Sequence, residues 1–148
     1  MTSKRVLNEA IILRKTYINN EDIIVTLKKD ETFVITVNNK TFNIPKNYPF
    51  VKPTIFINNI SYYSFLQTNS KRILELLGKN KIDCLCCSTI LCKDNWSPAY
   101  TIEKLLKEIE IMNNVKRRVK YQICIEDILK KYNYSNFIFH YIINFLDC

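Results

Sequence analysis

The sequence IIVTLKKDETFVITVNNKTFNI, residues 23–44, decides the fold class of this chain. Two runs rich in β-branched residues, 23–28 and 32–38, are separated by only three residues, a pattern that predicts a β-hairpin. A second turn, at 38–40, contains two Asn residues, which tolerate the left-handed backbone conformation of tight turns. A short third strand is expected at 41–44, so this part of the chain predicts an antiparallel sheet.

The flanking segments add helices and one more strand. Apolar side chains recur at helical spacing over 3–15, which predicts an N-terminal helix. Three prolines within 45–53 preclude a regular helix or a central strand, so a rigid extended loop is expected there. A fourth strand is expected at 54–58. A helix is expected at 62–77, with Gly78 capping its end in the left-handed conformation.

The C-terminal part of the chain is predicted to be helical. Thr101 opens a helix that is expected to run to residue 122, and a further helical region is expected at about 124–146. The apolar stripe of the first of these helices consists of Ile102, Leu105, Leu106, Ile109, Met112 and Val119. A helix followed by strands and then by helices is typical of the α+β class, and 148 residues suit one domain, 1–148.

Composition excludes several classes of function. A single Gly excludes glycine-rich phosphate loops, and a single His excludes a His-rich zinc site. No run of 18 apolar residues occurs, so we expect neither a membrane span nor a membrane partner. The net charge of +8 attracts acidic partners. The basic run at 116–120 is interpreted first as a solvated helix face, with salt-sensitive nucleic-acid binding as the alternative.

Four of the six cysteines lie within residues 84–92. Because the chain shows no secretory pattern, we expect free thiols in a reducing compartment, serving as a nucleophile, as zinc ligands or as small buried apolar residues. If this stretch is a strand, Cys84 and Cys86 point to one face and Cys87 points to the other. Cys84, Cys86, Cys87 and Cys92 could supply four zinc ligands, but their spacing is not the paired C-x2-C of structural sites, and a strand would scatter them. We therefore expect no bound metal and no cofactor.

Three motifs resemble the ubiquitin-conjugating (E2) enzyme family. The segment SKRVLNE, 3–9, is similar to the basic start of the first E2 helix, and YPFVKP, 48–53, is similar to the loop between the third and fourth E2 strands. CSTILCKDNWSPAYTI, 87–102, is similar to the E2 active-site stretch. The resemblance covers about 3–112, leaving 113–148 as divergent C-terminal helices, and looks most like E2-like proteins encoded by large DNA viruses.

This resemblance implies the ubiquitin-conjugating fold, with an N-terminal helix, a four-stranded antiparallel sheet, an inserted helix before the active-site stretch and C-terminal helices. It implies a cysteine that accepts ubiquitin, or a ubiquitin-like modifier, as a thioester from the activating enzyme (E1) of an ATP-dependent pathway. The modifier would then pass to lysine with the help of a RING-type ligase (E3). The implied location is the cytoplasm or nucleus, of the host cell if the protein is viral.

The resemblance also assigns roles to individual residues. Cys87, nine positions before Trp96, is the expected nucleophile, with Cys84 and Cys86 in reserve. The His-Pro-Asn tripeptide of the family is absent, and Asn80, seven residues before Cys87, is the candidate for the role of its Asn.

Two surfaces follow from the same resemblance. Lys4 and Arg5 are expected to meet the acidic ubiquitin-fold domain of E1. The residues expected to meet the E3 are Phe50, Trp96, Ser97, Pro98 and Ala99. Because His-Pro-Asn is missing, an inactive E2 variant that binds ubiquitin or an E3 stays open as the alternative, in one version with a zinc-bound Cys cluster.

Overall fold

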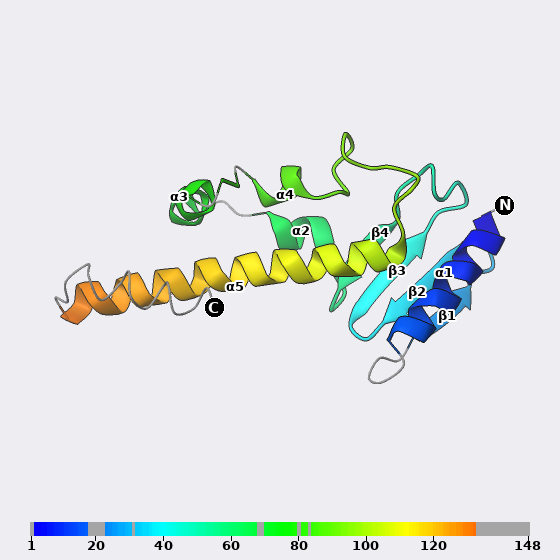
Figure 1. The fold of residues 1–148 in the computed structure, drawn as a ribbon, viewed down its shortest axis with the longest axis horizontal. Coiled ribbons are helices and arrows are strands. Elements are labelled where there is room, and N and C mark those ends of the chain that lie inside the picture. The colour runs from blue at the N-terminus through cyan, green and yellow to red at the C-terminus, as the bar shows by residue number, and fades with distance from the viewer. Residues whose placement is uncertain are drawn as a thin grey trace.

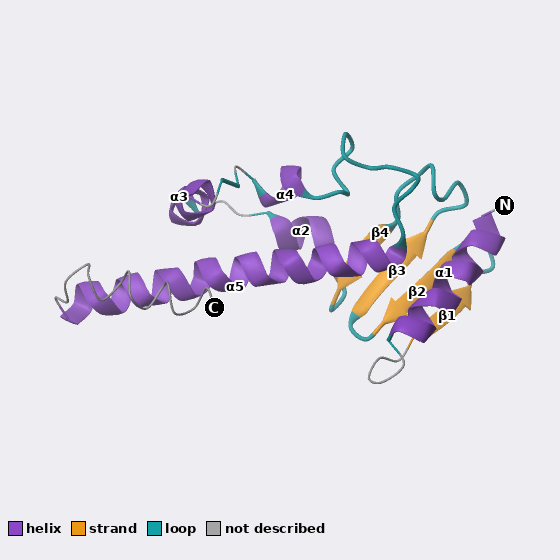
Figure 2. Ribbon diagram, viewed as in Figure 1, coloured by secondary structure: helices purple, strands orange, loops and turns teal. Residues whose placement is uncertain are grey.

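A computed structural model places a small antiparallel sheet at one end of the molecule and a long helix that runs away from it (Figure 1). The model describes residues 2–17, 23–30, 32–67, 70–79, 81–82 and 84–132. Helix α1, Thr2–Thr16, lies against the sheet, and helix α5, Ile102–Tyr132, starts beside α1. Three short helices lie along α5 (Figure 2). The α+β class predicted from the sequence is confirmed.

The sheet is a meander in which every strand pairs with the next one along the chain. The strands are β1 Ile23–Leu27, β2 Phe33–Val37, β3 Lys40–Ile44, β4 Thr54–Ile57 and β5 Ile60–Ser61. Ile35 lies opposite Phe42, and Phe42 lies opposite Ile55, so one row of apolar side chains faces the helices. The first of the predicted turns is closed by Asp30, whose carboxylate accepts hydrogen bonds from the backbone and hydroxyl of Thr32.

The prediction of a four-stranded sheet is wrong, because the sheet has five strands. Asn58 and Asn59 both adopt the left-handed conformation, with φ of 50° and 64°, and reverse the chain directly after β4. Two consecutive residues of positive φ make the tight turn whose twist suits a hairpin. Ile60 therefore pairs back onto Ile57, which adds a short edge strand that has too few residues to show a sequence pattern.

The helix expected at 62–77 is divided into two. Helix α2 covers Tyr62–Leu66, and α3 covers Lys71–Lys79. The chain leaves α2 in an extended conformation at Gln67, and the Ser70 hydroxyl accepts a hydrogen bond from the Ile73 amide at the start of α3, at 3.4 Å. A serine in this position favours a helix start over a helix interior.

The expected cap at Gly78 is also wrong. Gly78 lies inside α3 and no glycine has a positive φ. The left-handed residue is Lys81, with φ of 60°, and its amide donates to the Gly78 carbonyl at 2.9 Å. The helix thus continues past the glycine before the chain turns.

Helix α5 is a single helix of 31 residues, so the break expected between 122 and 124 is wrong. No Gly or Pro interrupts the segment, and Arg72 of α3 braces its far half by ion pairs with Glu126 and Asp127, at 2.9 and 2.7 Å. The remainder of the helical region expected at 124–146 lies outside the described residues beyond Tyr132. No described helix has the length and apolar character needed to cross a membrane.

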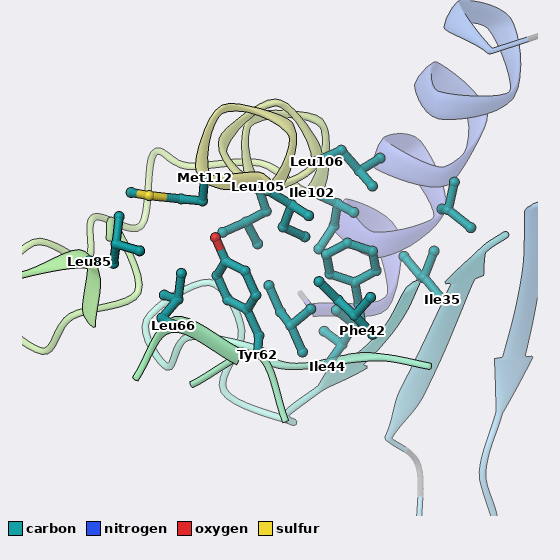
Figure 3. Packing of buried hydrophobic residues seen from close by; sticks show 14 of the residues in the cluster. Ile35, Phe42, Ile44, Tyr62, Leu66, Leu85, Ile102, Leu105, Leu106 and Met112 are labelled. Atoms are coloured by element: carbon teal, nitrogen blue, oxygen red, sulfur yellow. The ribbon is translucent and has the colours of Figure 1, made fainter. Parts of the chain in front are cut away.

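The hydrophobic core lies between the sheet and the first turns of α5 (Figure 3). Phe42 and Ile35 of the sheet are fully buried, as is Leu105 of α5. The predicted apolar stripe of α5 is confirmed, because all six of its members belong to this core. The core extends along α5 to Leu66 of α2 and Leu85, which packs the start of the cysteine-rich stretch against α2.

Candidate functional site

The cysteine-rich stretch is not a strand. Leu85–Ser88 form a helical turn, α4, and Cys84 precedes it with an extended backbone. Both the backbone amide and the hydroxyl of Ser88 donate to the Cys84 carbonyl, at 3.0 and 2.7 Å, and these bonds close the turn. The alternation expected of a strand, with Cys87 facing away from Cys84 and Cys86, is therefore lost.

The turn gathers three thiols on one side. The sulfurs of Cys84, Cys86 and Cys87 all lie within 4.8 Å of one another, and the Cys86 and Cys87 sulfurs are 3.9 Å apart. Cys87 is exposed, whereas Cys84 and Cys86 are half-buried. Cys92 is half-buried and does not belong to this group. The cluster therefore offers one accessible thiol backed by two others.

The three thiols influence one another's ionisation. The Cys86 thiol, assisted by backbone amides of the turn, donates to the Cys84 sulfur and lowers the pKa of Cys84. The same hydrogen bond, with partial burial, raises the pKa of Cys86 to about 12. The pKa of Cys87 is raised, chiefly by its hydrogen bond with Cys84. Cys84 therefore carries the first negative charge of the cluster.

Asn95 holds the cluster from the following loop. Its side-chain amide donates to the carbonyls of Cys87 and Thr89, at 2.9 and 3.0 Å. We did not predict this role from the sequence, which marks Asn95 only as a loop residue next to Trp96. The contact fixes the chain on the exit side of α4.

Glu108, on the buried face of α5, holds the same segment from beneath. One carboxylate oxygen accepts from the Thr89 hydroxyl at 3.0 Å, and the other accepts from the Ile90 amide at 2.6 Å. Burial raises the pKa of Glu108, although these hydrogen bonds oppose the rise. Sequence reasoning missed Glu108, whose only signal is an acidic residue on an otherwise apolar helix face.

The free energy of unfolding should depend on pH through Glu108. A carboxyl group with a raised pKa in the folded state stabilises the fold at pH values below its ordinary pKa, and this contribution is lost as pH rises through the folded-state pKa. Glu108→Gln removes the ionisation and keeps an acceptor for the Ile90 amide. Denaturant unfolding should therefore show wild type losing stability relative to Glu108→Gln as pH rises from about 4 to about 8.

The control for this experiment is Glu110→Gln, on the exposed face of the same helix. We expect it to change the free energy of unfolding by less than about 0.5 kcal/mol. A difference between wild type and Glu108→Gln that stays constant over the whole pH range would contradict the role assigned to Glu108.

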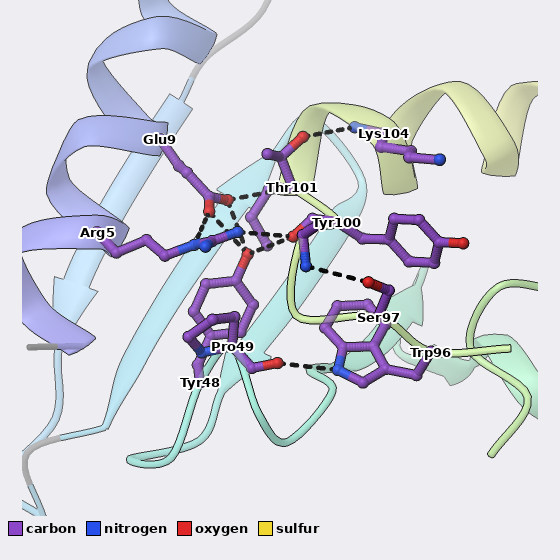
Figure 4. A network of polar contacts seen from close by, with 11 residues as sticks. Arg5, Glu9, Tyr48, Pro49, Trp96, Ser97, Tyr100, Thr101 and Lys104 are labelled. Carbon is purple, nitrogen blue, oxygen red and sulfur yellow. Dashed lines mark hydrogen bonds and ion pairs between the residues drawn. The ribbon is translucent and has the colours of Figure 1, made fainter. Parts of the chain in front are cut away.

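Two loops that carry predicted site residues are joined by Trp96 (Figure 4). Its indole nitrogen donates to the Pro49 carbonyl at 2.9 Å, next to a cis peptide bond between Tyr48 and Pro49. Phe50 on the first loop is 77% exposed. On the second loop Pro98 and Ala99 are exposed and Ser97 is half-buried. The structure thus brings the five residues predicted for E3 contact onto adjacent loops.

The two residues predicted to contact E1 have different surroundings. Lys4 is exposed, whereas Arg5 donates to Glu9 at 2.8 Å and to the Tyr100 carbonyl at 3.0 Å (Figure 4). Asn80 lies outside the described residues, so its predicted role at the active site stays a prediction.

Glu9 is the centre of the same network and was given no separate role by sequence reasoning. Its carboxylate accepts from the Tyr48 hydroxyl, at 2.8 and 2.9 Å, and from the Ile102 amide at 2.9 Å. The motif SKRVLNE contains Glu9, but its partners lie up to 93 residues away. The network connects α1, the loop of Tyr48 and the first turn of α5.

Comparison with known proteins returned no significant match to a family model, a curated protein or a solved structure.

In the basic run at 116–120 on α5, Lys116 makes contacts within the fold. Lys116 donates to the Phe65 carbonyl of α2 at 2.5 Å and lies 3.7 Å from the centre of the Phe65 ring, and burial lowers its pKa. Arg117 and Lys120 stay exposed beside an apolar groove of about 670 Å³ between α5 and the short helices. The interpretation as a simple solvated face holds for these two residues and not for Lys116.

Proposed function

We propose that this chain acts as an E2-type enzyme in which Cys87 accepts ubiquitin or a ubiquitin-like modifier from E1 as a thioester. The observation that carries the proposal is the exposure of Cys87 in the helical turn α4, nine residues before Trp96, whose indole joins the following segment to the YPF loop. An acyl acceptor must reach an incoming protein, and Cys87 is the exposed member of its cluster.

The reaction needs little from the protein beyond positioning. The Cys87 sulfur attacks the thioester carbonyl of the E1-bound modifier, a new carbon–sulfur bond forms, and the E1 cysteine leaves as a thiolate with the electron pair of the broken bond. The Cys87 proton passes to water, which the exposed position of the thiol permits. A lysine amine then attacks the new thioester and an amide bond forms. The Cys87 sulfur leaves as a thiolate with the electron pair of the broken bond, and the amine proton passes to water.

Other parts of the molecule supply surfaces for the partners. In the proposal the exposed Phe50 ring, with Pro98 and Ala99, contacts a RING-type E3, and Lys4 contacts E1. Arg5 supports that surface by fixing α1 to the Tyr100 carbonyl. The ubiquitin-conjugating fold itself is part of the proposal, supported by an N-terminal helix, an antiparallel meander and a YPF loop in the same order.

A thioester assay tests the proposal. Incubation of the metal-free chain with E1, ATP and ubiquitin should give an adduct on a non-reducing gel that disappears on reduction. Cys87→Ala should abolish the adduct. Cys87→Ser should give an oxyester that resists the reductant, because an oxygen–acyl bond is not cleaved by thiols. Cys124→Ala, at an exposed cysteine of α5, should leave the adduct unchanged.

Two results would contradict the assignment. An adduct that survives Cys87→Ala and disappears with Cys84→Ala would move the nucleophile to Cys84. The absence of any adduct would favour the second candidate function, an inactive E2 variant that binds ubiquitin or an E3. The packing of three thiols into one cluster favours this alternative, because a nucleophile needs only one of them.

A further inference from the structure

The three clustered sulfurs have the spacing of metal ligands. Zn²⁺ binds thiolates at about 2.3 Å, so two sulfurs of a tetrahedral site lie about 3.8 Å apart. The sulfurs of Cys86 and Cys87 are 3.9 Å apart, and all three sulfurs lie within 4.8 Å of one another. The sulfur separations therefore exceed the tetrahedral value by at most about 1 Å.

We propose that Cys84, Cys86 and Cys87 bind one Zn²⁺ ion through three thiolates. Among the described residues no fourth Cys, His, Asp or Glu belongs to the group, so water or an exogenous ligand completes the tetrahedron. The sequence argument against zinc had two parts, the absence of paired C-x2-C spacing and a strand that would have scattered the ligands. The turn α4 removes the second part, because the three sulfurs lie within 4.8 Å of one another.

The backbone around the cluster is already held in the binding conformation. Ser88 closes the turn onto the Cys84 carbonyl, and Asn95 fixes the Cys87 carbonyl. A site that is organised before the ion arrives loses less conformational entropy on binding. The exposed Cys87 gives the ion an entry path from solvent, and Cys84 and Cys86 are the half-buried ligands of the site. Each thiol that becomes a ligand releases its proton to solvent.

The site has a consequence for the proposed transthiolation. An ion bound to the Cys87 sulfur occupies the electron pair that would attack the E1-bound thioester, so zinc should suppress thioester formation. This consequence rests on the proposed function, whereas the metal site itself rests on the three sulfurs alone.

Titration with Co²⁺ alone tests the site, because Co²⁺ takes thiolate sites of the zinc type and gives sulfur-to-cobalt absorption bands. The full chain, reduced and stripped with a chelator, should bind one Co²⁺ with these bands, and Zn²⁺ should displace it. Cys84→Ser, Cys86→Ser and Cys87→Ser should each weaken binding by at least about tenfold. Circular dichroism confirms that each variant is folded.

The matched controls are the cysteines outside the cluster. Cys92→Ser and Cys124→Ser should leave the bands and the affinity unchanged. The absence of sulfur-to-cobalt bands, their persistence in a variant that lacks all three cysteines, or a requirement for Cys92 would overturn the site. Binding of Cu(I) without binding of Zn²⁺ or Co²⁺ would overturn the assignment to zinc.

The thioester assay, run with chelator and then with Zn²⁺, separates the two proposals. An adduct that forms with chelator and is lost with Zn²⁺ supports both. No adduct under either condition, together with a positive Co²⁺ titration, overturns the enzyme and leaves the metal site. An adduct that is insensitive to bound Zn²⁺ overturns the regulatory consequence.

Discussion

Replacing Glu9 with alanine should lower the free energy of unfolding by about 3 to 5 kcal/mol, as expected when one partner of a buried charge network is removed. The Glu9 side chain is only 7% exposed and accepts hydrogen bonds from Arg5, Tyr48 and Ile102. Its loss leaves the Ile102 amide buried without an acceptor, and leaves the Tyr48 hydroxyl only the long bond to the Tyr100 carbonyl, at 3.4 Å.

The position of Glu9 explains why the effect should be large. Ile102 is the first residue of α5, so Glu9 satisfies one of the orphan amides of a 31-residue helix and places a negative charge at its positive end. Tyr48 anchors the YPF loop, and burial together with Glu9 raises the pKa of its hydroxyl, which therefore stays protonated as a donor. One side chain thus joins three segments.

Glu103→Ala is the matched control for Glu9→Ala. Glu103 also forms an ion pair with a residue four positions away, Lys107, at 2.7 Å, but the Lys107 side chain is 63% exposed. Exposed pairs of this kind contribute at most about 0.5 kcal/mol. Guanidinium unfolding followed by circular dichroism measures both variants. Equal losses of stability in Glu9→Ala and Glu103→Ala would show that Glu9 does not hold the three segments together.

The second large effect is expected at Leu105. It is fully buried where α5 contacts the sheet, and Leu105→Ala should cost about 2 to 5 kcal/mol through lost apolar burial and the cavity left behind. Leu7→Ala is the control, because Leu7 is also a helical leucine but is 50% exposed.

The same unfolding measurement compares the two leucine variants. We expect Leu7→Ala to cost less than about 1 kcal/mol, since surface substitutions rarely exceed this value. The denaturant slope should be similar in both, because both retain the fold. A Leu105→Ala cost as small as that of Leu7→Ala would place the core of the protein elsewhere than between α5 and the sheet.

Two parts of the candidate site were predictable because each consists of residues that are close together in the sequence. The YPF loop and the Trp96 segment were recognised from short motifs, and the structure joins them through the bond from Trp96 to Pro49. The exposed position of Phe50 agrees with a surface role. Glu9, Glu108 and Asn95 were not predicted as supports, because each acts on backbone groups that only the folded chain brings near.

The arrangement of the cysteine cluster could not be predicted from the periodicity of the sequence. A strand and a helical turn predict opposite arrangements for adjacent cysteines, and four residues are too few to show which period applies. The turn is selected by the bonds from Ser88 to the Cys84 carbonyl and by the burial of Leu85 in the core. The second of these depends on contacts with the rest of the domain.

The sequence by itself determined the first helix, the four main strands and the apolar stripe of α5, because side-chain branching, Asn turns and helical spacing act within a few residues. The tertiary structure alone decided the fifth strand, the break between α2 and α3, the continuity of α5 and the gathering of three sulfurs at α4. At the fifth strand and at the start of α3 the local signal is one pair of Asn residues and one Ser, which is too short to show a pattern. Along α5 and at α4, packing and hydrogen bonds from distant segments outweigh local preferences that differ by less than about 1 kcal/mol per residue.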